Sequence, residues 1–261
     1  MSERSPGAAD PTRRFGDRVE SYVRSRPGYP PGLVPLLEAE AGLRRSDTVA
    51  DVGSGTGLLS QVFLRFGNAV FGIEPNREMR AAAEEAFARE PLFRSVEGTA
   101  EATSLPAASV DVVAAGQAFH WFDREKARAE FARILRPPRR VALVWNDRKT
   151  DGSAFSRGYE KLLREHGTDY AAVDHKNLGP EVFEEFFRPG GARLLTLPNE
   201  QRFDAEGLRA RLLSSSYTPP PGHPRHPAMV EALDRLFAET AEGGIVRMEY
   251  ETKVYVGTVG E

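Results

Sequence analysis

The chain has 261 residues, of which 40% are apolar, enough for a substantial hydrophobic core. Its 35 basic and 38 acidic side chains leave a formal charge of −3, which gives no electrostatic case for nucleic-acid or anionic-membrane binding. It contains no cysteine, which excludes disulfides, thiol nucleophiles and cysteine zinc sites. The first fifteen residues lack the apolar segment of a secretory signal, and no apolar run approaches the ~18 residues of a spanning helix. We therefore expect a cytoplasmic globular protein without a membrane or nucleic-acid partner.

The chain up to about residue 146 divides into a Pro-, Arg- and Gly-rich flank and a regular alternating region. The flank, residues 1–47, contains one expected helix at Leu33–Ala41. From residue 48 to about 146, β-rich runs alternate with stretches whose apolar residues recur at helical spacing. This alternation predicts right-handed crossovers and a parallel sheet that is covered on both faces. The β-rich runs are 48–52, 69–74, 93–97, 110–115 and 140–145.

The remaining segments are less regular. Residues 151–190 look helical and charged, and 193–198 are a candidate sixth strand. Residues 205–241 contain two helical patterns around a Pro-rich loop. Apolar and charged residues then alternate over 246–256, which predicts a half-buried antiparallel strand at the edge of the sheet.

The sharpest motif is the run Asp51–Gly57, with the sequence DVGSGTG, between the first strand and the first helix of the alternating region. Glycines at this turn let a ligand approach the backbone closely, at the point where open α/β sheets bind ligands. The following helix N-terminus offers free N–H groups that suit a carboxylate. Glu74 lies 23 positions after Asp51, at the end of the second strand, and can accept both hydroxyls of a ribose. The motif indicates nucleoside binding, with a purely structural Gly-rich turn as the alternative.

The spacing of the glycines distinguishes two classes of nucleoside-binding enzyme. Nicotinamide enzymes carry GxGxxG or GxGxxA, whose third small residue packs against the sheet. Here the spacing is GxGxG, and position 58 is Leu. The pattern favours a methyltransferase over a dehydrogenase.

Residues 49–57 resemble motif I of the class I S-adenosylmethionine-dependent methyltransferases. The stretch through Trp145 is similar to the branch that holds the ubiquinone-biosynthesis and trans-aconitate methyltransferases. The resemblance covers about residues 15–146 well and the last strand loosely, and it implies S-adenosylmethionine as cofactor. The cofactor-binding residues that it implies are Tyr22, Arg26, Asp51, Gly53, Ser54, Gly55, Gly57, Glu74, Pro75, Asn76, Thr99, Ala100, Glu101 and Gln117.

The resemblance also implies a role for each part of this set. Asp51 and Gly53 would hold the region of the methionyl amine, Gly55 and Gly57 would line the cofactor, and Glu74 would bind the ribose.

On the adenine side, Pro75 and Asn76 would flank the base, and residues 98–101 would border its edge. Many relatives carry an acid where this chain has Thr99, so that contact with the exocyclic amine would be weaker here. Gln117, at the end of the fourth strand, would lie near the methionine moiety.

Together these features predict an α/β fold with a Rossmann-like, mostly parallel seven-stranded sheet, helices on both faces, an antiparallel last strand and a helical lid. We divide the chain into an N-terminal arm and lid helix (1–47), a cofactor-binding core (48–146) and a C-terminal part with lid helices and final strands (147–261), within one structural domain.

Two segments could shape the transfer site. Residues 119–123, FHWFD, follow the fourth strand, where an aromatic pair could face a sulfonium and exclude water. His120 and Trp121 are the catalytic candidates, His120 as a general base. The alternatives are a hydrogen-bonded structural histidine and aromatic rings that only pack the next helix. Residues 22–30 resemble the family's opening segment, in which Tyr22 and Arg26 would touch the methionyl end or the substrate; otherwise this segment is a solvated arm.

The predicted function is therefore methyl transfer from S-adenosylmethionine to a small acceptor such as a carboxylate or a phenol. One alternative is a non-catalytic, cofactor-binding regulatory protein of the same fold. A nucleic-acid or protein methyltransferase is disfavoured by the acidic balance and by the absence of an Asn/Asp-Pro-Pro-Tyr/Phe segment after the fourth strand. His223 and His226 lack a third ligand, so we expect no metal site.

Overall fold

A seven-stranded sheet with the order β3-β2-β1-β4-β5-β7-β6 forms the centre of the fold. The computed structural model describes residues 26–168, 170, 178–215 and 217–260. The first five strands pair in parallel, and β7 runs antiparallel to both β5 and β6. This confirms the predicted α/β class and the antiparallel last strand. The strands are β1 (Thr48–Val52), β2 (Ala69–Ile73), β3 (Phe93–Val96), β4 (Val110–Gly116), β5 (Leu135–Arg148), β6 (Ala192–Phe203) and β7 (Val246–Thr258).

The prediction that the last strand lies at the edge of the sheet is wrong. β7 lies between β5 and β6, and β6 forms the edge. Val254 pairs with Val144 of β5 on one side and with Leu195 of β6 on the other. The alternation of apolar and polar residues shows which face of a strand is buried. It does not show whether the strand pairs with one neighbour or with two, so it cannot distinguish an edge strand from an inner one.

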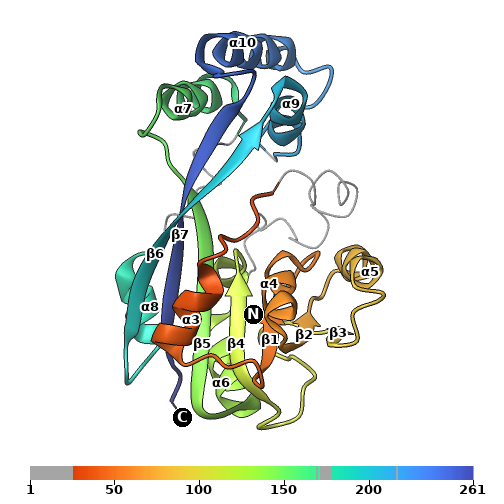
Figure 1. Ribbon diagram of the computed structural model, residues 1–261, viewed down its shortest axis with the longest axis vertical. Coiled ribbons are helices and arrows are strands. Elements are labelled where there is room, and N and C mark those ends of the chain that lie inside the picture. Colours follow the sequence, from red (N-terminus) through yellow and green to blue (C-terminus); the bar gives the residue numbers. More distant parts are fainter. Residues whose placement is uncertain (1–25, 169, 171–177, 216, 261) are drawn as a thin grey trace, which may run out of the picture.

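Helices cover both faces of the sheet (Figure 1). On one face, Leu37 of α3 and Phe63 of α4 share a core with Val112 of β4. On the other face, Phe131 of α6 and Phe186 of α8 pack in a separate core. Helix α3 is therefore part of the layer that covers the sheet, rather than the lid helix that the sequence predicted. The helices of these layers are α3 (Leu33–Ala41), α4 (Leu58–Phe66), α5 (Arg77–Ala86), α6 (Arg124–Ile134) and α8 (Pro180–Phe186).

A third hydrophobic core lies beyond the carboxyl ends of the parallel strands, at the top of Figure 1. Helices α7 (Ala154–His166), α9 (Ala205–Leu213) and α10 (Arg225–Thr240) enclose it together with the upper ends of β6 and β7. We call these three helices and strand ends the cap. The three helices come from segments in which the sequence predicted lid helices, but a lid role for the cap stays a prediction. The long strands β6 and β7 connect the cap to the rest of the sheet. The division of the chain at residues 47 and 146 stays a prediction.

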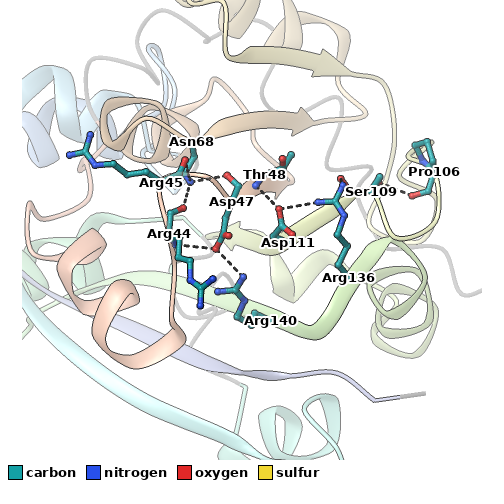
Figure 2. A network of polar contacts seen from close by, with 10 residues as sticks. All are labelled: Arg44, Arg45, Asp47, Thr48, Asn68, Pro106, Ser109, Asp111, Arg136 and Arg140. Atoms are coloured by element: carbon teal, nitrogen blue, oxygen red, sulfur yellow. Dashed lines mark hydrogen bonds and ion pairs between the residues drawn. The ribbon is translucent and has the colours of Figure 1, made fainter.

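At the opposite end of the sheet, polar side chains hold the starts of the strands together (Figure 2). Asn68 is fully buried, and its amide donates to the backbone oxygens of Arg44 and Asp47, both at 2.8 Å. Asp111 accepts from the Thr48 N–H at 2.8 Å and from Arg136 at 3.0 Å. These bonds satisfy backbone N–H and C=O groups in the loops at this end of the sheet, so we interpret its polar residues as structural.

Candidate functional site

Each of the three motif glycines has a different structural reason to be glycine. All three have positive φ, at +70° for Gly53, +56° for Gly55 and +87° for Gly57. A Cβ on Gly53 would lie 2.6 Å from the Cβ of Ala118, and one on Gly57 would lie 2.3 Å from the ring of Phe87. A Cβ on Gly55 would meet no atom within 4 Å. Gly53 and Gly57 therefore serve packing, whereas the space over Gly55 is open for a ligand to approach the backbone.

Glu74 connects the end of β2 to the glycine-rich turn. Its Oε2 accepts from the Gly55 N–H at 3.0 Å, and its Oε1 accepts from the Asn76 N–H at 2.9 Å. Burial raises the pKa of this carboxyl above its ordinary value, although the two backbone N–H groups act in the opposite direction. Each carboxylate oxygen keeps acceptor capacity after these bonds, so Glu74 can also accept from the hydroxyls of a ribose.

Asp51 is completely buried at the end of β1. Its Oδ2 accepts from the Ser60 hydroxyl of α4 at 2.6 Å, and its Oδ1 has no hydrogen-bond partner among the described residues. Burial raises the pKa of Asp51 to about 7, despite the opposing hydrogen bonds from Ser60. A cationic group near Oδ1 would stabilise the ionised form. The sequence analysis did not identify Ser60, although a hydroxyl one helical turn after a glycine-rich motif was a readable signal.

The segment after β4 faces this turn. Phe122 lies 3.7 Å from the position of a Cβ on Gly53. Gln117 has a φ of +58°, and its side-chain amide donates to the backbone oxygen of Asn146 at 3.2 Å. The end of β4 is therefore held between the motif of β1 and the end of β5, where the resemblance predicted that Gln117 would lie near the methionine moiety.

Trp121 and Phe122, the two rings of the predicted aromatic pair, lie in different environments. The ring of Phe122 packs inward, edge-on to Phe119 at 5.9 Å between centroids, so packing accounts for it. Trp121 stays 50% exposed, with its ring 4.7 Å from the ring of His120. Of the aromatic rings in this segment, Trp121 is the one that is free to face a substrate, beside the half-buried His120.

The loops on the predicted adenine side are tied to one another. Asn76 caps α5 by accepting from the Met79 N–H at 3.0 Å, and Pro75 before it is exposed. The Glu101 carboxylate accepts from the Asp123 N–H at 2.8 Å, which joins the loop after β3 to the loop after β4. Thr99 is exposed and Ala100 is buried. Asn76 and Glu101 thus have structural partners, whereas Pro75 and Thr99 present free surface.

The described part of the N-terminal arm reaches the carboxyl ends of β4 and β5. The Gly28 carbonyl accepts from the side-chain amides of Asn146 at 3.2 Å and Asn199 at 2.8 Å. The Tyr29 hydroxyl covers Gly116, the last residue of β4. Arg26 is half-buried next to this anchor.

Tyr22 lies outside the described residues. The anchoring asparagines were missed in the sequence analysis, and Asn146 after the apolar run of β5 was the signal that could have revealed them.

These residues fit S-adenosylmethionine. Glu74 could accept from a ribose, the open space over Gly55 would admit a ligand close to the backbone, and the unmatched Oδ1 of Asp51 could accept from an ammonium group. Seven strands in the order 3-2-1-4-5-7-6, with the glycine-rich turn after β1, define a Rossmann-like α/β fold.

Comparisons with known proteins agree with this class. Residues 50–143 match the family described as the methyltransferase domain. An uncharacterized methyltransferase of Mycobacterium tuberculosis is 40% identical over 139 residues, which are 53% of this chain and 54% of that protein. An uncharacterized methyltransferase of Schizosaccharomyces pombe is 33% identical over 137 residues, 52% of this chain and 53% of that protein. The matched region therefore spans about half the length of these curated relatives.

A solved structure supports the fold over a larger share of the chain. A protein of Anaeromyxobacter dehalogenans described as a type II methyltransferase gives a TM-score of 0.62 at 24% identity, and the match covers 90% of this chain and 98% of that chain. Over residues 50–143 the chain is thus similar to a methyltransferase domain, and it shares the fold of the solved structure over most of its length.

Two further findings concern the part of the chain that the structure describes. It contains no group of three or more His, Asp or Glu side chains that could hold a metal ion. His223 accepts from the Arg225 N–H at 3.1 Å, and His226 bonds to the Pro219 carbonyl at 2.7 Å, so both have local turn partners. Within the same residues, no helix has the length and apolar character needed to cross a membrane.

Proposed function

We propose that the protein is an enzyme that transfers a methyl group from S-adenosylmethionine to a small-molecule acceptor such as a carboxylate or a phenol. The observation that carries the proposal is the pairing of Glu74 with the Gly55 N–H beneath open space. A purely structural turn needs neither a half-buried acid at this point nor an uncovered glycine.

The cofactor, when bound, supplies a methyl group already activated on a sulfonium, so positioning and desolvation remain for the protein. Glu74 would orient the ribose, and the neighbourhood of Asp51 would hold the methionyl amine. Trp121 would cover the transfer zone and exclude water, and its ring face would suit a positive charge. His120 would take a proton only from an acceptor that must lose one, because a carboxylate is already nucleophilic.

The surrounding segments lie where a small-molecule acceptor would bind in this fold. The Gly28 anchor and the cap lie on the side of the carboxyl ends of the parallel strands, where α/β proteins form their ligand sites. Segments of this kind, carried on a rigid sheet, usually determine specificity.

The test has two stages. Calorimetric titration with S-adenosylhomocysteine should give saturable binding. A turnover screen with S-adenosylmethionine labelled in its methyl group, run over acids, phenols and amines, should then transfer label to at least one class. Binding without transfer to any acceptor would favour the non-catalytic, cofactor-binding alternative. Absence of binding would contradict both the methyltransferase and this alternative.

A further inference from the structure

The cap contains a buried polar cluster that the proposed cofactor site does not use. Arg148, the last residue of β5, lies over the ring of Tyr159 at 5.2 Å and donates to Glu160 at 2.5 Å. Arg211 of α9 is only 5% exposed, and Tyr250 of β7 is 2% exposed. Tyr159 and Tyr250 interact electrostatically with both arginines. We call Arg148, Tyr159, Glu160, Arg211 and Tyr250 the cap cluster.

The charges in the cap cluster do not balance. Burial alone would raise the pKa of Glu160, but hydrogen bonds from Arg164, Tyr170 and Arg148 lower it to about 2, so this carboxylate is ionised and already paired. Arg211 donates to the Ser215 hydroxyl at 2.8 Å, and no carboxylate of a described residue forms an ion pair with it. Since a guanidinium stays protonated in proteins, the cap cluster holds about one positive charge in excess.

The hydrogen bonds are also incomplete. Arg211 Nε, Arg148 Nη1 and the Tyr159 hydroxyl are buried without a hydrogen-bond partner among the described residues. A buried donor without a partner is costly, so three of them near one another are unusual in a purely structural cluster. A monovalent anion with two acceptor oxygens would satisfy these donors and balance the charge, and a carboxylate is such a group.

The cap cluster lies at a suitable distance from the proposed transfer site. Arg148 follows Asn146 by two residues, and the Asn146 backbone oxygen accepts from Gln117 at the end of β4. Two residues of strand advance by about 7 Å, which is the length of a small organic molecule.

We propose that the cap cluster binds the carboxylate of a small organic acid and thereby holds a second group of the same molecule, the methyl acceptor, near the end of β4. This inference rests on the proposed function, because it names the class of acceptor for that site. The anchored carboxylate is distinct from the atom that receives the methyl group.

The test uses the full chain saturated with S-adenosylhomocysteine and two probes of nearly equal shape, phenylacetate and its neutral amide, phenylacetamide. Phenylacetate should raise the melting temperature of the wild-type protein in a saturable manner, and phenylacetamide should not. In Arg211→Met the dissociation constant for phenylacetate should rise at least tenfold, and Arg211→Lys should recover part of the loss. Arg209→Met is the matched control on the same helix, because Arg209 is half-exposed and pairs with Asp234; it should bind phenylacetate normally.

Protein stability separates a binding role from a structural one. Replacing a buried, unpaired charge with an apolar residue of similar size is often neutral or stabilising, so Arg211→Met should melt no lower than the wild type without probe. If Arg211→Met does not fold, Tyr159→Phe gives the same test, because it removes only the unpartnered hydroxyl.

The inference would be overturned if phenylacetate did not raise the melting temperature of the wild type more than phenylacetamide does. It would also be overturned if the rise persisted in both Arg211→Met and Tyr159→Phe. Titration of the same samples with S-adenosylhomocysteine reports separately on the cofactor site. Normal binding there with no acid effect would reject only the acid site, whereas no binding in the wild type would reject the proposed function.

Discussion

Replacing Glu74 with Ala removes the group that joins the glycine-rich turn to the predicted ribose site. Both carboxylate oxygens already accept backbone N–H bonds, from Gly55 at 3.0 Å and from Asn76 at 2.9 Å. A hydrogen bond to a charged group contributes about 1.5–3 kcal/mol, so loss of the ribose acceptor should weaken S-adenosylhomocysteine binding roughly tenfold to a hundredfold. The two exposed N–H groups should lower the free energy of unfolding by about 1–2 kcal/mol.

Glu74→Gln should be nearly as damaging as the Ala variant. The two N–H groups bond to different oxygens, so the amide NH₂ of Gln must face one of them, donor against donor. Glu97→Ala is the matched control, because that carboxylate follows the adjacent strand, is 78% exposed and pairs with Arg80 at 2.7 Å.

The assay is calorimetric titration with S-adenosylhomocysteine, with thermal unfolding measured on the same preparations. Glu97→Ala should bind like the wild type. A folded Glu74→Ala protein with the wild-type dissociation constant would refute the assignment of Glu74 to the ribose.

Three further predictions concern the same site. The pKa of Asp51 is raised from 3.8 to about 7, so between these values the folded protein keeps a proton that the unfolded chain has lost. The free energy of unfolding without ligand should therefore decrease as the pH rises from about 4 to about 7. Asp51→Asn should remove that slope in denaturant titrations, and an unchanged slope would contradict the role of Asp51. Gly55→Ala should abolish S-adenosylhomocysteine binding. Gly191→Ala, which also has positive φ and no atom within 4 Å of an added Cβ, should only lower stability by about 1–2 kcal/mol; equal binding in both variants would assign the turn a structural role alone. Trp121→Ala should lower turnover more than S-adenosylhomocysteine affinity, and normal turnover would show that this exposed ring does not shape the transfer zone.

His120→Ala makes a separate distinction between acceptor classes. Turnover should fall strongly with a phenol or an amine, which must lose a proton, and little with a carboxylate. Initial rates over pH with one acceptor of each class measure the difference, and equal losses for both classes would argue against a general base at this position.

The sequence by itself determined the alternation of strands and helices and indicated where the proposed cofactor site lies. Parallel strands buried on both faces must be apolar along their length, and the helices between them must present an apolar stripe, so both leave periodic signals. The helix Leu33–Ala41 and the strand Thr48–Val52 have the predicted bounds. Glycines with positive φ and an acid at the end of β2 were also readable, because backbone conformation and ligand chemistry restrict those positions to few residue types.

Only the tertiary structure decided which strand forms the edge, what the motif residues contact, and which polar groups meet in the cap. β7 lies inside the sheet because β6 returns along its whole length, and that pairing depends on residues distant in sequence. The different roles of Gly53, Gly55 and Gly57 depend on Ala118, Phe87 and open space, none of which the local sequence records. Arg148 and Arg211 are 63 positions apart in the sequence and share tyrosine neighbours only because β5, β7 and α9 fold together. A periodic pattern shows which face of an element packs against the core. The charge balance of a buried cluster depends on residues that are distant in the sequence and come together only when the elements pack.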